Sequence, residues 1–217
     1  MTLNNDKLEK FHLTNHHFPV CMNTNTPCFC GSKANFSSCC QPYINKEKHV
    51  ETAEQLMRSR FSAYAIGNAQ YIFDTYAKTS QAEQSVKEIK EWSESCFWIA
   101  LSIYPLAKTI NKTTEQFVEF SAFYVSNNTL CELREKSRFI LEECKATSIM
   151  QTSTNNNTDT NNMENSTSKQ WRYIDGDIIA HNELTKIKRN DLCPCNHYPS
   201  AWQVNKGKKF KRCCGSN

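Results

Sequence analysis

The sequence predicts an α+β protein in which helices pack on an antiparallel sheet and two small four-cysteine modules flank the domain. Apolar residues follow a helical period from Thr52 to about Trp92, and the period changes towards two after Cys96. Eight of the twelve cysteines form two sets with matching spacing, one near each end of the chain. The chain has 217 residues, of which 39% are hydrophobic, and is therefore long enough for one medium domain with small appendages.

Composition and charge restrict where the protein acts. No window approaches the roughly eighteen apolar residues of a membrane span, and the start of the chain lacks the basic-then-apolar order of a secretion signal. We therefore expect a cytoplasmic protein with no membrane partner. The net charge is +4, but residues 186–212 hold eight Lys or Arg against Asp191 alone and carry +7. A basic partner surface is therefore expected only at the C-terminal end.

The helical part of the pattern divides into three segments. A capping box at Thr52 predicts a first helix, which ends before the breaking pair Gly67-Asn68. The apolar period then continues over 69–77 and predicts a second helix that meets the first at a tight bend. Another capping box predicts that a third helix begins near Ser80.

Segments rich in aromatic and β-branched residues predict the strands of the sheet. These segments are 97–106, 116–125, 137–144 and 171–179. We expect a loop or hairpin at 109–115 between the first two strands, and a turn at Asp175-Gly176 within the last. A type I′ or II′ turn is favoured there over a metal-binding role for the aspartates.

Polar segments complete the predicted domain organisation. The chain has no sustained period before the first cysteine set, and 151–168 consists mostly of Asn, Thr and Ser, which bury no apolar area. We therefore expect a flexible tail and a disordered insertion at a hairpin tip. The predicted order is a tail at 1–26, a module at 27–44, an α+β domain at 50–182 with an insertion at 147–169, and a second module at 188–217.

The two cysteine sets share the order Cys-x-Cys, a gap and an adjacent Cys-Cys pair. The first set is Cys28, Cys30, Cys39 and Cys40, and the second is Cys193, Cys195, Cys213 and Cys214. Four thiolates from two close pairs are the ligands of a structural zinc ion, and we predict two Zn²⁺ sites. Disulfides and iron–sulfur ligation are alternatives, and the reduced cytosol disfavours the first. Four cysteines leave no open position for a catalytic water.

The two modules differ in the length of the gap. The first gap has eight residues and the second has seventeen, so treating 196–204 as an insertion restores a gap of eight. A module this short has almost no apolar core, and metal binding, at about 10–16 kcal/mol for structural zinc, would fold it. The lysines before the second Cys-Cys pair would also soften the negative charge of a zinc ion held by four thiolates.

Cys-x-Cys-Gly-Ser followed by Cys-Cys resembles the SEC-C motif, the zinc knuckle at the C-terminal end of the translocase ATPase SecA, which contacts the chaperone SecB and the ribosome. With the intervening RSRFSAY, FVEFSAFY, EKSRF and WRYIDGD, residues 27–217 resemble the YchJ family. This resemblance implies a cone of helices against a curved sheet, similar to nuclear transport factor two, and a largely uncharacterised function. The chain departs from the family at Asn196-His197, where Gly-Ser would stand, and at Arg134, where a histidine is common.

These observations favour a zinc-binding adaptor that docks through its knuckles to a protein partner, such as a chaperone, or to the ribosome. One alternative is RNA binding by the basic C-terminal knuckle, where Phe210 and Trp202 could stack on bases. Another is ligand binding or catalysis in a pocket of the cone domain. Its polar candidates are Arg58, Arg60, Asp74, Glu119, Glu135 and Arg138. We expect the two helix arginines to form ion pairs with Glu135 or Asp74 instead.

Overall fold

The structure is a computed structural model that describes residues 25–105, 114–145, 167–201 and 207–215. Most of the expected tail at 1–26 and of the expected insertion at 147–169 lies outside this part of the chain. The helices in it are α1 (Gln41–Ile44), α2 (Ala53–Ala65), α3 (Ala69–Asp74), α4 (Lys78–Gln81) and α5 (Val86–Ser95). The strands are β1 (Phe97–Tyr104), β2 (Glu115–Ser126), β3 (Thr129–Lys145) and β4 (Thr167–Lys186).

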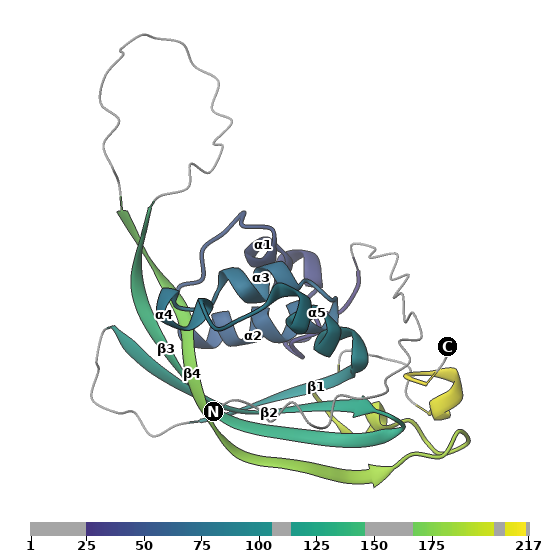
Figure 1. Ribbon diagram of the computed structural model, residues 1–217. Coiled ribbons are helices and arrows are strands. Elements are labelled where there is room, and N and C mark those ends of the chain that lie inside the picture. The colour runs from purple at the N-terminus through teal and green to yellow at the C-terminus, as the bar shows by residue number, and fades with distance from the viewer. Residues whose placement is uncertain (1–24, 106–113, 146–166, 202–206, 216–217) are drawn as a thin grey trace.

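The strands form one antiparallel sheet in the order β1-β2-β3-β4, and the sheet curves around the helices (Figure 1). The predicted class, α+β with helices on a curved antiparallel sheet, is therefore confirmed. Among the described residues, no helix is long and apolar enough to cross a membrane.

Side-chain caps fix where the helices begin. The Thr52 hydroxyl accepts a hydrogen bond from Gln55 N (3.1 Å), and α2 begins at the predicted place. The predicted start of the third helix is wrong, because α5 is capped by Ser85, whose Oγ accepts from Glu88 N (3.4 Å). Ser80 lies in α4, and its hydroxyl donates to the carbonyl of Ile174 in β4 (2.6 Å). A tertiary contact therefore uses the group that the sequence pattern assigned to a cap.

Aromatic rings fill the space between α2 and the inner face of the sheet. The Trp98 ring centroid lies 5.7 Å from that of Phe61, 5.1 Å from that of Tyr64 and 5.3 Å from that of Tyr124. Phe139 of β3 and Leu56 of α2 are fully buried in the same cluster. Burial of these side chains is what holds the helical layer on the sheet.

The predicted turn at Asp175-Gly176 is wrong, because strand β4 continues through these residues to Lys186. Its pairing with β3 skips one residue at Ile174, Ile179 and Leu184, which lie five residues apart. Each skip is a β-bulge, which bends a strand and increases its twist. The bulges interrupt the alternation of apolar and polar residues, and this made a continuous strand look like a strand followed by a turn.

Gly176 is explained by a neighbouring strand rather than by a turn. A Cβ atom added to Gly176 would clash with Oε1 of Glu135, whose side chain lies against this glycine. Glycine therefore serves here for the close approach of a side chain from β3.

The hairpin between β2 and β3 was not predicted. Asn127 and Asn128 have φ angles of 51° and 57°, and Ser126 pairs with Thr129 across them. Two positive φ angles in a two-residue loop define a type I′ turn, which accepts asparagine and favours glycine at the second position. Because of this turn, β3 begins at Thr129, well before the predicted strand.

Replacement of Asn128 by alanine is expected to lower the free energy of unfolding by about 1–2 kcal/mol, because alanine lacks a local hydrogen bond that favours the left-handed region. The matched variant Asn128→Gly should be at least as stable as the natural protein. Equilibrium unfolding in urea measures both, and an alanine variant as stable as the glycine variant would contradict the turn assignment.

Candidate functional site

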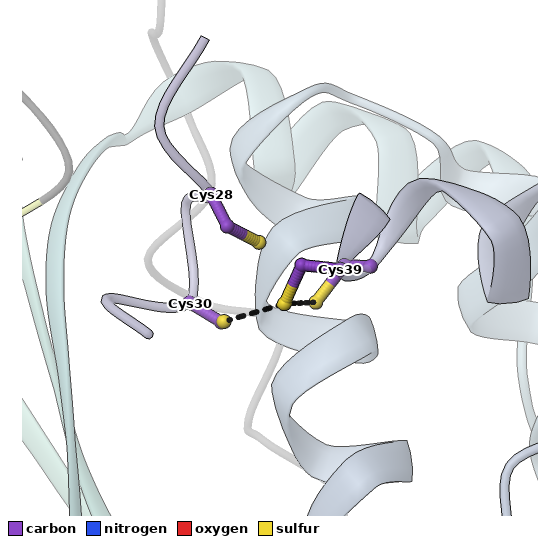
Figure 2. A group of neighbouring side chains, drawn as sticks. Cys28, Cys30 and Cys39 are labelled. Carbon is purple, nitrogen blue, oxygen red and sulfur yellow. Dashed lines mark hydrogen bonds between the residues drawn. The ribbon is translucent and has the colours of Figure 1, made fainter. Parts of the chain in front are cut away.

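The first cysteine set forms a compact, buried cluster. The four Sγ atoms of Cys28, Cys30, Cys39 and Cys40 lie within 4.8 Å of one another, and the three labelled side chains in Figure 2 point toward a common centre. The Sγ atom of Cys39 is 3.7 Å from that of Cys30 and 3.9 Å from that of Cys40. Cys39 is partly exposed and the other three are buried.

Local backbone geometry brings these cysteines together. Cys28 N donates to Ala34 O (2.8 Å) and Gly31 N to Cys28 O (3.1 Å), which close a tight loop around the Cys-x-Cys pair. Gly31 has a φ of 75°, a left-handed value that glycine adopts without steric cost. A short 3₁₀ helix (Phe36–Ser38) then reverses the chain and delivers Cys39 and Cys40 from the other side.

The second set repeats this backbone pattern. The Sγ atoms of Cys193, Cys195, Cys213 and Cys214 also lie within 4.8 Å of one another, and all four side chains are buried. Cys193 N donates to Lys208 O (3.0 Å), as Cys28 N does to Ala34 O in the first knuckle. The 3₁₀ helix before the Cys-Cys pair (Phe210–Arg212) begins with phenylalanine in both knuckles.

Asn196 closes the second knuckle across its insertion. Its Nδ2 atom donates to Cys193 O (2.7 Å), and its Oδ1 atom accepts from Gly207 N (2.5 Å), which lies beyond the inserted residues. The replacement of the motif glycine by asparagine therefore supplies two hydrogen bonds that hold the ends of a longer loop together. The sequence showed that asparagine replaces the motif glycine, but it did not show these two hydrogen bonds.

The spacing of the sulfur atoms fits a single metal ion in each cluster. Tetrahedral coordination with bonds of about 2.3 Å places the ligand sulfurs about 3.8 Å apart. Two Sγ–Sγ distances are 3.7 and 3.9 Å in the first cluster, and two are 3.4 and 3.9 Å in the second. A polynuclear iron–sulfur cluster needs room for several irons and sulfides between its cysteines. Sulfur atoms within 4.8 Å of one another leave room for one ion only.

Hydrogen bonding among the sulfurs separates their pKa values. In the first cluster, the pKa of Cys30 is lowered by hydrogen bonds, of which the one with Cys28 has the largest effect and those with Cys39 and Cys40 add to it. The pKa of Cys28 is raised, chiefly by the same hydrogen bond with Cys30. In the second cluster, hydrogen bonds with Cys195 and Cys214 lower the pKa of Cys193 to about 2. Hydrogen bonds, chiefly with Cys28, also lower the pKa of Cys39, to about 7, whereas in the second cluster the pKa values of the three neighbours of Cys193 are raised. A divalent cation at the centre would allow all four sulfurs to ionise together.

Helix α2 supports the first cluster with two side chains one turn apart. Arg58 Nη1 donates to the carbonyl of Cys30 (3.2 Å), and Ser62 Oγ lies within hydrogen-bond distance of Cys28 Sγ (3.8 Å). Phe29 and Phe36 of the knuckle are buried in the same apolar cluster as α2. The expectation that this module lacks a core is therefore wrong, because it shares the core of the domain.

The second knuckle packs in a separate apolar cluster. Phe210 and the four cysteines lie together with Ile99 and Ala100 of β1, Val125 of β2 and Leu130 of β3. The Tyr198 ring, in the insertion, lies 4.3 Å from the ring of Phe123. This knuckle therefore stands at one end of the sheet, where Figure 1 shows it in yellow.

The two knuckles touch each other, which the sequence did not reveal. A Cβ atom added to Gly31 would clash with the backbone carbonyl oxygen of Ser200. Ser200 belongs to the insertion of the second knuckle, so this segment bridges the two cysteine clusters.

Comparison with known proteins decides the family. A family model described as the YchJ middle, NTF2-like domain matches residues 52–176, more than half of the chain. The chain belongs to the YchJ family. A UPF0225 protein of Photorhabdus laumondii is 32% identical over 190 residues, which cover 87% of this chain and 98% of that protein. A UPF0225 protein of Vibrio cholerae is 32% identical over 189 residues, or 87% of this chain and 99% of that protein.

Solved structures share the fold of this YchJ-family chain. A crystal structure of a SEC-C motif containing protein from Psychrobacter arcticus matches with a TM-score of 0.54 and 24% identity, over 88% of this chain and 94% of that one. The solution structure of a SEC-C motif containing protein from Rhodopseudomonas palustris matches with a TM-score of 0.53 and 21% identity, over 70% and 98%. The family model, the two cysteine clusters and the shared fold together confirm the predicted NTF2-like architecture with cysteine knuckles.

The inner face of the YchJ-family domain holds a buried arginine among tyrosines. The guanidinium carbon of Arg60 lies 4.5 Å from the ring centroid of Tyr76 and 4.6 Å from that of Tyr173. Arg60 Nη1 also donates to Ile72 O (2.8 Å) and Thr75 Oγ1 (2.7 Å). Two aromatic faces and two oxygens thus stabilise this cation, which ties α2 to α3 and β4.

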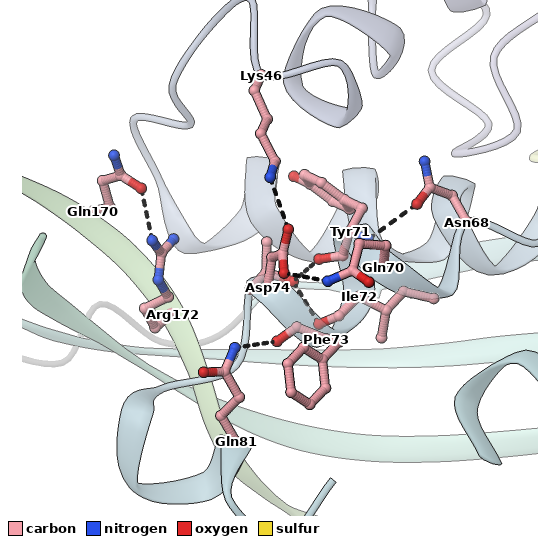
Figure 3. Close-up of polar contacts among 11 residues, drawn as sticks. Lys46, Asn68, Gln70, Tyr71, Ile72, Phe73, Asp74, Gln81, Gln170 and Arg172 are labelled. Atoms are coloured by element: carbon pink, nitrogen blue, oxygen red, sulfur yellow. Dashed lines mark hydrogen bonds and ion pairs between the residues drawn. The ribbon is translucent and has the colours of Figure 1, made fainter. Parts of the chain in front are cut away.

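The prediction that Arg58 and Arg60 form ion pairs with Glu135 or Asp74 is wrong. Arg58 pairs with Glu54 (2.8 Å), one turn earlier on α2. Asp74 accepts from Lys46 Nζ (2.8 Å) and from Gln70 Nε2 (2.7 Å), on the outside of the helical layer (Figure 3). The contacts of Arg58 with Glu54 and of Gln70 with Asp74 follow from i,i+4 spacing on the helices, whereas Lys46 reaches Asp74 from the segment after α1.

The remaining polar candidates also have structural partners. Glu119 pairs with Arg134 (Nε–Oε1 3.0 Å), and Arg138 pairs with Asp175 (Nε–Oδ1 2.9 Å). Glu135 accepts from the hydroxyl of Tyr173 (3.0 Å). An open groove of about 450 Å³ lies on the sheet. Its lining is Phe117, Lys136, Arg138, Asp175, Gly176 and Asp177. The cysteine clusters are therefore the best-defined candidate site of this YchJ-family protein.

Proposed function

We propose that this YchJ-family protein is a cytoplasmic zinc-binding adaptor whose two SEC-C knuckles hold one structural zinc ion each. The observation that carries the proposal is that the four Sγ atoms of each cluster lie within 4.8 Å of one another, with two Sγ–Sγ pairs in each at 3.4–3.9 Å. All-sulfur tetrahedral sites of this kind select zinc among the common divalent ions, and they are closed to substrate. None of the described cysteines is in a disulfide, so all eight motif sulfurs are open to metal ligation.

The docking role falls to the C-terminal knuckle. Arg58 and Ser62 clamp the N-terminal knuckle to α2, and its aromatic residues are buried. The C-terminal knuckle instead stands at the end of the sheet and exposes most of its basic residues. The SEC-C resemblance suggests a chaperone or the ribosome as the partner.

Elemental analysis of purified protein, together with identification of co-purifying macromolecules, tests the proposal. We expect two zinc ions per chain. Cys39→Ser/Cys40→Ser should remove one ion, and Cys213→Ser/Cys214→Ser should remove the other ion together with the partner. A metal-free protein with thiols oxidised in pairs would overturn the zinc assignment. A partner retained by the second variant would place docking on the cone domain.

A further inference from the structure

The C-terminal knuckle carries a surface of one charge sign. Two stretches, the end of β4 with the start of the knuckle (186–192) and residues 208–212, hold seven described Lys and Arg residues, of which six are exposed and Lys211 is partly exposed. The basic face, as we call this set, comprises Lys186, Lys188, Arg189, Lys208, Lys209, Lys211 and Arg212. The single acidic residue within these two stretches is Asp191.

Backbone pairing gathers the basic face from two separate stretches of the chain. Lys211 N donates to Arg189 O (3.1 Å), and Leu192 forms a bridge with Lys209. Phe210 N donates to Asp191 O (2.8 Å) between these two pairs. The stretches 186–192 and 208–212 therefore run side by side, and their charges share one surface. Residues adjacent in space, rather than only in sequence, generate the local positive potential.

The basic face has no ionic partner among the described residues. Elsewhere, surface cations such as Lys46, Arg134 and Arg138 lie in ion pairs. None of the seven members of the basic face does. The carboxylate of Asp191 accepts the backbone N–H of Lys188 (2.8 Å), so it caps a turn.

The basic side chains and the cysteines of this knuckle lie in different environments. Cys193 and Cys214 are buried, whereas Lys208, Lys209 and Arg212 are exposed to solvent. The basic side chains are therefore available to an external anion.

We propose that the basic face binds the phosphate backbone of single-stranded RNA, a proposal that rests on the proposed docking role of this knuckle and names its partner. Lysine is depleted at protein–protein interfaces, whereas lysine contacts to phosphate dominate the affinity of nucleic-acid complexes. The α-helices α1–α5 lie within the curve of the sheet, away from the basic face, so none is placed to enter the major groove of duplex DNA (Figure 1). Single-stranded backbones follow positively charged strips, and aromatic stacking adds to this in other proteins. The Phe210 ring is buried, so the expected stacking on it is wrong and the contacts proposed here are to phosphate, while Trp202 lies outside the described residues.

Fluorescence anisotropy of zinc-loaded full-length protein with a labelled oligouridine tests this proposal between 50 and 200 mM salt. Contacts to about four phosphates give a slope of log affinity against log salt of about −3, which is a loss of about 60-fold over this range. The variant Lys188→Ala/Lys208→Ala/Lys209→Ala should reduce the slope to about −1 and the loss to about 4-fold.

A matched control removes the same charge from another face. Lys48, Lys87 and Lys90 are exposed outside the knuckle, and their triple alanine variant should retain the natural slope. Equal effects of the two triple variants would overturn the proposal. Tighter binding of duplex DNA, or of polyglutamate as an acidic-protein mimic, would overturn it as well.

Zinc content, measured on the same samples, separates this proposal from the proposed function. A protein that holds two zinc ions but binds no oligouridine at 50 mM salt refutes the RNA proposal and leaves the zinc assignment standing. A zinc-free protein refutes the zinc assignment instead.

Discussion

The double substitution Cys39→Ser/Cys40→Ser is expected to unfold much more of the protein than the equivalent substitution in the C-terminal knuckle, Cys213→Ser/Cys214→Ser. The N-terminal knuckle shares an apolar cluster with α2, α3 and the inner face of the sheet, whereas the C-terminal knuckle belongs to a smaller, separate cluster. A structural zinc ion contributes about 10–16 kcal/mol, and a whole domain is stable by only about 5–15 kcal/mol. Loss of the first ion should therefore cost most of the stability of the fold.

Thermal unfolding followed by circular dichroism and tryptophan fluorescence measures this difference, because Trp92 and Trp98 report on the helical layer. For a protein of this size, a loss of 5 kcal/mol corresponds to about 10–20 °C. For the N-terminal variant we expect the unfolding temperature to fall by at least this amount, or no cooperative transition because the protein is already unfolded at 25 °C. The C-terminal variant should show a clearly smaller fall in the unfolding temperature.

The cysteine Cys144, which lies outside both clusters, supplies the control. Cys144→Ser should keep two zinc ions and the natural unfolding temperature. Equal destabilisation by the two double variants would show that the N-terminal knuckle is not part of the core.

Local sequence signals predicted the elements whose stabilising contacts are also local. The capping box at Thr52 and the breaking pair before α3 depend on residues a few positions apart, and each cysteine set lies within one short segment of about a dozen to two dozen residues. Such contacts form in the same way whatever the rest of the chain does, so the class of fold and the two cysteine clusters could be predicted.

Contacts between distant residues account for what the sequence missed. The hydroxyl of Ser80 is used by β4, and Gly176 faces Glu135 of a neighbouring strand. Bulges at Ile174 and Ile179 interrupt the alternation in β4, although they are the feature that bends the sheet. Burial of the N-terminal knuckle against α2 likewise depends on residues more than twenty positions away.

Among the described glycines with positive φ, Gly31 is the one whose replacement by alanine should lower the free energy of unfolding most, because it lies at the contact between the two knuckles. Gly31, Gly67 and Gly207 have φ angles of 75°, 71° and 82°. Any of them replaced by alanine incurs the cost of a left-handed backbone, about 1–2 kcal/mol. A Cβ atom at Gly67 or Gly207 meets nothing within 4 Å, whereas one at Gly31 clashes with the Ser200 carbonyl.

The three alanine variants therefore separate backbone strain from the contact between knuckles. Gly67→Ala and Gly207→Ala should each lower the free energy of unfolding by about 1–2 kcal/mol. Gly31→Ala should lower it further, because neither backbone can move without displacing its own cysteine cluster. Hydrogen exchange at Ala201, whose amide donates to Tyr198 O (3.0 Å), should accelerate in Gly31→Ala alone. If exchange there is unchanged and the loss of stability matches that of Gly67→Ala, the two knuckles do not support each other.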